Sequence, residues 1–582
     1  MSLQKLTYDC FYILFNKHLY NDRSTLFTCL FVTRSWGEMI TRLLYANPFE
    51  NPKHKKNHIR IISTLKNFLN QREMDQLSRN GIIIKNVRKT FYNYPKYLKV
   101  YNQKNIRKVI LNWLDIKKIE LNDETKDNIV SLFHYMLLRQ CENIKQMNTS
   151  STSLIRNIFN NRFIENYIKN LSNLKSIQFD FVGGELNNRI FLEFLRKLSN
   201  ICLNLEYLQI NIDKYNSNPQ PIKEICSIIK NQRNLKRFKI SNDESRTHAF
   251  RTSNSQNKLL DDIFLSLYSK KDSLVSLDFV YINFKGVSFF KNLKCLSNLK
   301  YLRFRNCKKI TLDNCEELRS SSFELLELSI QSSKLKSEVK IMMIEYLGGS
   351  LRRLMIDKPT IPIIDALLNY CSCLETLDIK ISSNVTLQVL QNFSKLSKLN
   401  IKNLNITSSS DCRDSIFKNL AKNLPTSVEV VSIRYPRSYN IKQFLDNVHC
   451  NLTTINLQDN INYKPILDYI ERSNNHLKFL GIATLENKRS SALKIFRYSC
   501  FFSKTRGTEP RPSYCAECSR NNQTPVQFLP KRRVYRMIIP MTEQGRRKKK
   551  RVEKDLLLLF FFFVSGFSAK RHESLFQVVN KL

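Results

Sequence analysis

The residues best suited to chemistry in this sequence are a cysteine pair and eight scattered histidines. Cys515 and Cys518 have the C-x-x-C spacing found in zinc sites, but a structural zinc ion needs four ligands, and Cys500 and His572 lie far along the chain. The sequence contains no phosphate-binding glycine loop, no H-E-x-x-H pair and no nucleophile elbow. We therefore predict a protein that is not an enzyme and that holds no metal ion or cofactor.

Basic side chains are the stronger candidate for a binding site, because they recur beside short apolar segments that could form strands. The candidate substrate-binding residues are Lys236, Arg237, Lys239, Lys300, Arg303, Arg305, Arg352 and Arg353. Such a surface can bind an acidic or phosphorylated group of a protein substrate through charge-assisted hydrogen bonds. The alternative is a solvent-exposed face on which these cations form ion pairs with acidic residues of the same protein. The acidic residues expected on the same strands or on neighbouring ones are Asp278, Glu327, Glu375 and Asp378.

A recurring sequence motif, which we call the phrase, must position these side chains. It reads L-K-Y-L-R-F from Leu299 and L-E-T-L-D-I from Leu374. The first residues of the phrases are Leu174, Leu205, Leu235, Leu274, Leu299, Leu325, Leu351, Leu374, Leu396, Val428, Leu452 and Leu477. Each phrase predicts a short strand whose fourth and sixth residues, such as Leu377 and Ile379, lie on one face.

The segments between the phrases have the spacing of helices. In one of them the apolar residues Phe191, Phe194, Leu195 and Leu198 follow the i, i+3, i+4, i+7 pattern of a single helix face. A unit of strand, turn and helix cannot bury its apolar face alone, so neighbouring units must stack. We therefore predict an α/β solenoid of about twelve strand–turn–helix repeats over residues 155–493.

The phrases recur at intervals of roughly 22 to 39 residues, and this arrangement resembles the leucine-rich repeats of long, irregular proteins. That family often has Asn or Cys at the ninth position of the phrase, as Cys307 and Asn460 do here. The resemblance implies strands on the inner side, helices outside and a surface for protein–protein interaction. The longest interval holds the polar stretch 241–258, which we expect to be an exposed loop.

The first residues of the chain have apolar spacing that predicts three short helices, over 9–18, 25–32 and 36–45. So few residues cannot bury a core of their own. This stretch resembles an F-box, with Thr7 in the place of the usual proline. The residues that match the family pattern, and that the resemblance implies for adaptor binding, are Leu6, Asp9, Cys10, Ile13, Leu26, Cys29, Val32 and Trp36.

The F-box resemblance implies the substrate-receptor subunit of a Skp/cullin/F-box (SCF) ubiquitin ligase. Residues 1–48 would dock on a Skp-type adaptor and through it reach a cullin, the repeats would hold a protein substrate, and catalysis would belong to other subunits. One alternative is a helical unit that merely caps the repeats. Another is a leucine-rich repeat interaction scaffold outside any ligase.

Residues 49–154 are predicted to form a basic helical connector and N-terminal cap, with one helix around Ile62 and another over 123–138. Aromatic residues near Tyr94 alternate with basic ones, a pattern that can clamp nucleic acid. A cap or a degenerate first repeat is the competing interpretation.

Beyond the last phrase the composition changes. A basic run at 546–551 is followed by leucines and phenylalanines over 556–563, too few to span a bilayer. We predict that residues 494–582 are an unstructured tail, and we hypothesise that they are a gene-model artefact.

The charge and the cysteine content limit the expected partners and the expected cellular compartment. The chain carries 94 basic and 50 acidic residues, a net charge of +44. Its abundant Lys, Asn and Ile have AT-rich codons, so nucleic acid is not the expected partner despite this charge. The 15 cysteines and the lack of a secretory signal favour buried thiols in a reducing compartment, cytoplasmic and/or nuclear. No membrane association is expected.

Overall fold

The computed structural model describes Phe15 and the residue ranges 23–50, 55–82, 90–150, 161–181, 189–212, 220–242, 254–383, 385–409, 412–434, 438–458, 464–473, 477–483 and 494–496. The chain divides into two units, Met1–Ser491 and Ala492–Leu582. The second unit contains the short strand β15 (Lys494–Phe496), which falls in the first residues of the predicted tail. The rest of that tail, with Cys515, Cys518 and the basic run, lies outside the described residues.

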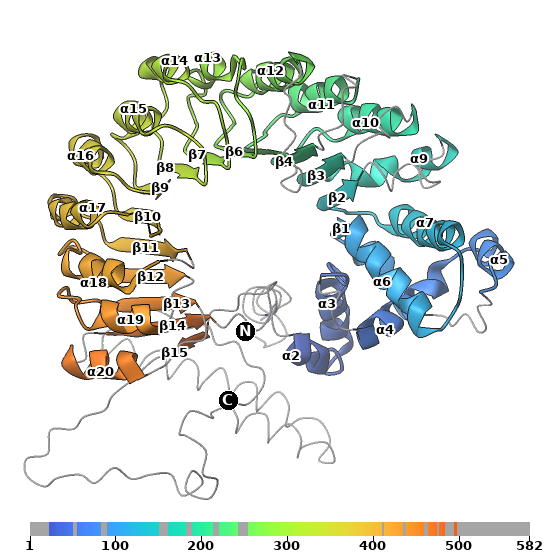
Figure 1. The fold of residues 1–582 in the computed structure, drawn as a ribbon. Helices are drawn as coiled ribbons and strands as arrows, with labels where there is room; N and C mark the ends of the chain where they lie inside the picture. Colours follow the sequence, from blue (N-terminus) through green and yellow to red (C-terminus); the bar gives the residue numbers. More distant parts are fainter. Residues whose placement is uncertain are drawn as a thin grey trace, which may run out of the picture. The chain divides into compact units, whose positions relative to one another are not determined.

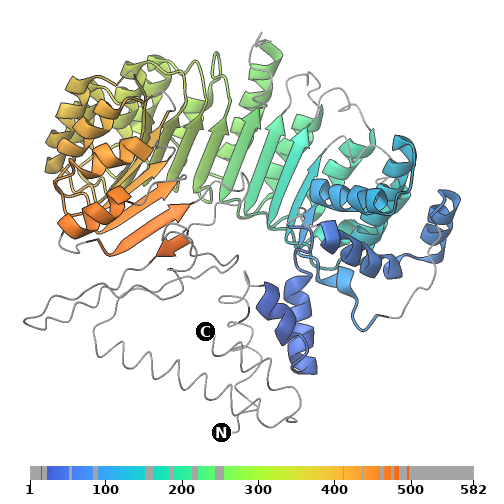
Figure 2. The same ribbon diagram turned by 60° about the horizontal axis from the view of Figure 1, so that its bottom comes forward.

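The first unit is built on a parallel sheet whose strands follow one another in chain order, each bonded to the next (Figure 2). Its strands are β1 (Val100–Asn102), β2 (Gln146–Ser150), β3 (Ser176–Phe181), β4 (Tyr207–Ile212), β5 (Arg237–Asn242), β6 (Ser276–Val280), β7 (Tyr301–Arg305), β8 (Glu327–Gln331), β9 (Arg353–Asp357), β10 (Thr376–Ile381), β11 (Asn403–Ser408), β12 (Val430–Arg434), β13 (Thr454–Gln458) and β14 (Phe479–Ala483). Equivalent phrase positions pair, as Leu354 does with Leu377 and Leu377 with Leu404.

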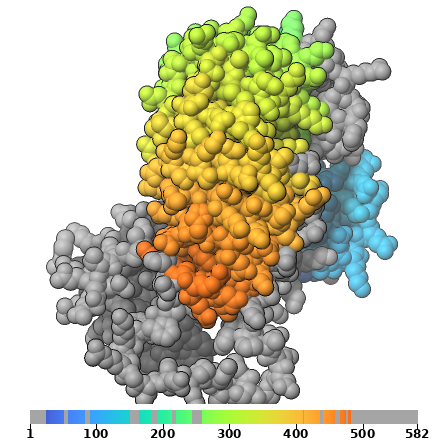
Figure 3. Space-filling model, turned by 60° about the vertical axis from the view of Figure 1, so that its left-hand side comes forward, coloured from blue at the N-terminus to red at the C-terminus, as the bar shows by residue number. Residues whose placement is uncertain are grey.

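Helices connect consecutive strands and cover one side of the sheet, so that strands line the inner side of the array and helices the outer side (Figure 1). They are α9 (Asn161–Tyr167), α10 (Arg189–Ile201), α11 (Gln220–Asn231), α12 (Asn254–Tyr268), α13 (Phe289–Leu293), α14 (Leu312–Glu316), α15 (Ser337–Leu347), α16 (Ile361–Tyr370), α17 (Leu387–Asn392), α18 (Asp414–Lys422), α19 (Ser438–Leu445) and α20 (Lys464–Arg472). Figure 3 shows the later repeats packed as one continuous body. The predicted leucine-rich repeat solenoid is confirmed.

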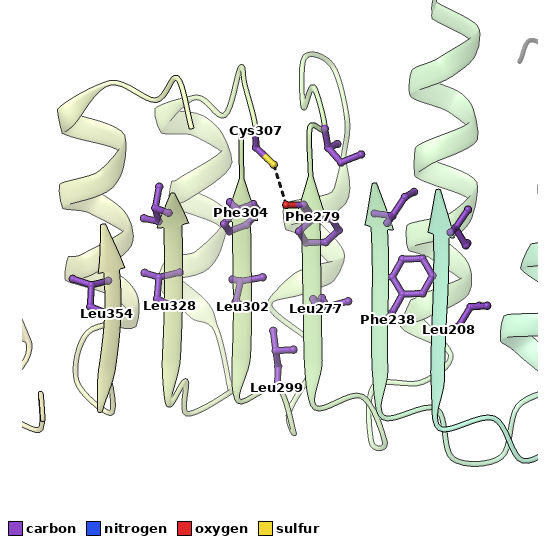
Figure 4. Close-up of a cluster of buried hydrophobic side chains, with 14 of the residues drawn as sticks. Leu208, Phe238, Leu277, Phe279, Leu299, Leu302, Phe304, Cys307, Leu328 and Leu354 are labelled. Atoms are coloured by element: carbon purple, nitrogen blue, oxygen red, sulfur yellow. Dashed lines mark hydrogen bonds between the residues drawn. The ribbon is translucent and has the colours of Figure 1, made fainter. Parts of the chain in front are cut away.

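The core lies between the sheet and these helices. Figure 4 shows one row of its side chains aligned across the strands: Leu208, Phe238, Leu277, Leu302, Leu328 and Leu354. Phe279 stacks on Phe304 of the next strand with ring centroids 5.4 Å apart. The thiol of Cys307, at the ninth phrase position, donates to the carbonyl of Phe279 at 3.5 Å. Each repeat therefore buries its apolar face against the repeat before it, as stacking requires.

Two features differ from the sequence prediction. Leu396 does not begin a strand phrase, because it lies in the 3-10 helix η8 (Phe393–Lys398), and the strand that follows begins at Asn403. The phrase there starts at Ile401, which offers the same apolar spacing and is fully buried. The sheet also begins earlier than the first predicted phrase, with β1 and β2. Their phrases carry Tyr101 and Thr149 at buried positions, which obscures the leucine pattern.

Helices precede and flank the first strands: α2 (Arg23–Cys29), α3 (Arg34–Leu44), α4 (Lys55–Leu65), α5 (Gln71–Arg79), α6 (Gln103–Ile116) and α7 (Asp123–Gln140). The helices expected over 25–32, 36–45 and 123–138 correspond to α2, α3 and α7. The helix expected over 9–18 lies outside the described residues, apart from Phe15. Over the part of the chain that the structure describes, no helix is long and apolar enough to span a membrane.

Candidate functional site

Helices α2 and α3 form the N-terminal helical pair, and α3 is positioned by a cap and an aromatic contact. The hydroxyl of Thr33 accepts the backbone N–H of Trp36 at 3.1 Å, which fixes the start of α3. Helix α3 then buries Trp36 and Ile40, and the Trp36 ring meets Phe15 edge-on at 5.2 Å. The stripe that packs inward is thus the one that the apolar spacing indicated.

The residues implied for adaptor binding occupy different environments. Leu26, Cys29 and Trp36 are buried, with exposed fractions of 2%, 9% and 7%, whereas Val32 is 41% exposed. The buried residues can support a docking surface only by holding the helices in place. The remaining four implied residues lie outside the described ranges: Leu6, Asp9, Cys10 and Ile13. Whether any of the eight contacts an adaptor stays a prediction.

An exposed apolar surface lies beside these buried residues. Phe27 is 56% exposed and Phe31 70%, and their rings meet edge to face at 5.5 Å. We call Phe27, Phe31 and Val32 the α2 patch. Sequence reasoning missed both phenylalanines. The signal was present in the sequence, because two aromatic residues four apart share one face of any helix that includes both. In the structure α2 ends at Cys29, and Phe31 and Val32 lie in the turn that follows it.

The helical pair is joined to the start of the sheet. The backbone N–H groups of Lys99 and Val100 donate to the carbonyl of Ala46 at 2.9 and 3.0 Å. The ring of Tyr45 at the end of α3 lies 4.4 Å from that of Tyr94. Tyr92 and Tyr97 also make contacts within the protein, with Tyr94 and Arg42 respectively, whereas Phe91 is 98% exposed. Three of the four aromatic residues in this stretch are therefore used internally, which favours the cap interpretation over a nucleic-acid clamp.

The second candidate surface is the side of the sheet that faces away from the helices, which we call the open face. It carries the first, third and fifth residues of each strand, because side chains alternate along a strand. The predicted substrate residues Arg237 and Lys239 lie on it on β5, Arg303 and Arg305 on β7, and Arg353 on β9. Three more predicted residues precede the strands β5, β7 and β9 by one position: Lys236, Lys300 and Arg352.

Ion pairs occupy most of these predicted cations. Arg303 Nε lies 2.6 Å from Glu327 Oε1, and this hydrogen bond raises the pKa of Arg303. The other pairs are Arg305–Asp278 at 2.5 Å, Arg353–Asp378 at 2.6 Å, Arg352–Glu375 at 3.6 Å and Lys236–Glu206 at 3.6 Å. The three acids that face Arg303, Arg305 and Arg353 are almost fully buried. At these strands the geometry matches the ion-paired face, which was the alternative to a substrate-binding surface in the sequence analysis.

Three predicted cations have no carboxylate within 4.0 Å among the described residues: Arg237, Lys239 and Lys300. Arg237 instead lies over the ring of Tyr207 on β4, with its guanidinium carbon 5.1 Å from the ring centre. Lys239 is half-buried, and burial lowers its pKa against the opposing field of Asp278. The unbalanced positive charge of the open face in this region therefore lies on β5.

Most cysteines of the described ranges are buried free thiols, for example Cys202, Cys307 and Cys371. Burial raises the pKa of Cys202 to about 12, and its thiol donates to the carbonyl of Leu171 at 2.9 Å. Such thiols are protonated at neutral pH and contribute to packing rather than to nucleophilic chemistry. Within the described ranges, no group of three His, Cys, Asp or Glu side chains could hold a metal ion.

No protein-family model matches the chain, and no curated protein matches it. Among solved structures, the chain is similar to the crystal structure of the Rad7 and Elc1 complex in yeast, with 16% identity and a TM-score of 0.33, over 67% of this chain and 91% of that one. It is also similar to the leucine-rich repeat-containing protein LegL7 from Legionella pneumophila, with 15% identity and a TM-score of 0.32, over 56% of this chain and 98% of that one. The fold assignment rests on the strand pairing described above.

Proposed function

We propose that this chain is the substrate-receptor subunit of an SCF-type ubiquitin ligase in the cytoplasm or nucleus. In this proposal the α2 patch docks on a Skp-type adaptor, the adaptor connects the chain to a cullin, and the open face takes a protein substrate. The observation that carries the proposal is the exposure of Phe27, Phe31 and Val32 on a small helical unit. This role requires only that the chain bind partners at two surfaces.

The α2 patch has the character of a docking surface. Exposed apolar side chains that gather in one place mark interaction sites, whereas single ones are ordinary. Phe27 and Phe31 already contact each other, so a partner can cover both rings at little cost in side-chain entropy. Large apolar anchors near the centre of an interface typically cost about 2 kcal/mol or more each when cut to alanine. This patch can therefore supply a major part of an adaptor's binding energy.

The experiment is co-purification of the full chain with a Skp-type adaptor from the same organism. The test variant is Phe27→Ala with Phe31→Ala. The matched control is Leu265→Ala on α12, a residue 58% exposed and therefore as accessible as Phe27. We expect the double variant to bind the adaptor roughly a hundredfold more weakly or worse, and the control to bind as the parent chain does.

Two outcomes would count against the proposal. If the parent chain forms no complex at micromolar concentration, the ligase role is lost and the chain is a repeat scaffold outside any ligase. If the double variant binds as well as the control, the adaptor uses another surface. A steep dependence of partner binding on salt would instead indicate a nucleic-acid partner.

A further inference from the structure

Strand β5 presents two cations to the open face, Arg237 and Lys239. Arg237 and Lys239 are two residues apart on one strand, so their side chains leave the same face with their Cα atoms about 7 Å apart. Neither has a carboxylate within 4.0 Å among the described residues, whereas Arg303, Arg305 and Arg353 on later strands each have one.

The nearby acids are engaged elsewhere. Asp278 on β6 is the register partner of Lys239, but it binds Arg305 of β7 through both carboxylate oxygens, at 3.3 and 2.5 Å. Glu206, just before β4, lies 3.3 Å from Lys175 and 3.6 Å from Lys236. These two acids near β5 are thus paired with other cations, and among the described residues the positive charge of Arg237 and Lys239 remains available to a ligand.

The Arg237 side chain is positioned before any ligand arrives. Tyr207 lies under the Arg237 guanidinium, which orients its planar fork of donors. The Tyr207 hydroxyl in turn donates to Gln209 Oε1 at 2.7 Å, and Gln209 donates to Asn211 at 2.9 Å. Lys239 is half-buried beside this polar row, so its ammonium is partly stripped of water and gains from an anion.

We infer that Arg237 and Lys239 bind a phosphorylated side chain on an extended segment of a partner protein. A phosphoryl group carries about two negative charges at neutral pH, which matches two unpaired cations, whereas a carboxylate would balance only one of them. The arginine fork can donate two parallel hydrogen bonds to the phosphoryl oxygens, and the lysine supplies a point charge. The inference rests on the proposed role of the open face as the substrate surface, whose ligand class it names.

The test measures binding of short fluorescent alanine–glycine peptides to the full chain. One peptide has a central phosphoserine, one has glutamate and one has serine at that position. The variant is Arg237→Gln with Lys239→Gln. The control is Lys380→Gln with Arg434→Gln, which removes the same charge from the fifth positions of β10 and β12, where the described residues place no carboxylate within 4.0 Å of either side chain.

We expect the phosphopeptide to bind the parent chain and the glutamate and serine peptides to bind much more weakly. The β5 variant should lose at least about tenfold in phosphopeptide affinity, because each charged hydrogen bond contributes that much on its own. The control should lose less than about twofold. Adaptor co-purification, measured on the same variants, should be unchanged, so failure of this site is separable from failure of the α2 patch.

Several results would overturn the inference. The phosphate site is excluded if the phosphopeptide does not bind at millimolar concentration, or if the glutamate peptide binds equally well. Equal losses in the β5 variant and the control would show a general effect of net charge. Tighter binding of a single-stranded oligonucleotide that also depends on Arg237 and Lys239 would assign the site to nucleic acid instead.

Discussion

Arg305 on β7 binds both carboxylate oxygens of Asp278 on β6, at 3.3 Å from Nε and 2.5 Å from Nη2. The pair joins neighbouring repeats across the open face, and Asp278 is only 11% exposed there. It also decides what is left for Lys239, because Asp278 would otherwise be its closest acidic partner by register. One contact therefore stabilises the stack and keeps a neighbouring cation available.

Replacing Arg305 tests both roles. We expect Arg305→Met to lower the free energy of unfolding by about 1 to 3 kcal/mol, because it leaves the buried Asp278 carboxylate without its charged donor. The variant should also weaken phosphopeptide binding, since Lys239 can then turn to Asp278. Urea unfolding measures the first effect, and peptide titration the second.

The control for this prediction is the double variant Arg305→Met with Asp278→Asn. Removing the charge of the acid as well should restore most of the lost stability, as expected for two residues in contact. Independent, additive effects of the two substitutions would show that the pair does not act as a unit.

The stacked leucines of the sheet are the most sensitive positions for stability. Leu377 is 1% exposed between Leu354 and Leu404 of the neighbouring strands. Leu377→Asp should cost several kcal/mol, because it buries an unpaired charge. Thr376→Asp, one residue earlier and on the open face, should cost less than about 1 kcal/mol. Thermal unfolding of the two variants compares the faces, and similar losses would contradict the assigned strand orientation.

Acid should destabilise the protein through His134. Its Nδ1 lies 2.8 Å from the Tyr101 hydroxyl, and burial lowers its pKa to about 3, well below the value of about 6.5 in an unfolded chain. The unfolded chain therefore takes up this proton first as the pH falls. The stability contributed by neutral His134 is fully present above about pH 6.5 and is lost progressively as the pH falls toward 3.

Between pH 6.5 and pH 5 this single group should cost about 1.5 kcal/mol of stability. His134→Gln keeps an acceptor for Tyr101 but cannot titrate, so its stability should fall less over that interval. Denaturant unfolding at several pH values gives the difference between the two proteins. Identical pH profiles would mean that His134 is protonated as easily in the folded state as in the unfolded one.

Truncation tests the boundary between the two units at Ala492. Removing residues 492–582 should leave the melting temperature of the remaining chain within about a degree or two of the parent value. Ending the chain before Lys464 removes α20 and β14 as well, and it should lower the melting temperature clearly, because the last described repeat of the first unit covers the one before it. Loss of soluble expression on the shorter cut at 492 would contradict the predicted tail.

The sequence alone determined the repeat architecture. Apolar alternation in phrases such as the one at Leu374 depends on side-chain direction along a strand, and the spacing of Phe191, Phe194 and Leu198 depends on helical pitch. Both are local properties of the chain. They identified the buried face of a strand correctly where its segment contained only one possible apolar register. Where two apolar registers overlapped, after Leu396, the local pattern favoured the earlier one, and pairing with β10 selected the phrase at Ile401.

Only the tertiary structure decided which charges are satisfied and which apolar side chains are exposed. Arg353 and Arg237 are each the third residue of their phrase, but Arg353 faces Asp378 on its neighbouring strand and Arg237 lies over the ring of Tyr207. Phe27 and Leu26 are adjacent apolar residues, but only Leu26 packs inward. These outcomes depend on residues from other repeats or helices. The physical reason is that ion pairing and burial depend on which residues are neighbours in space, and the sequence of one segment does not specify those neighbours.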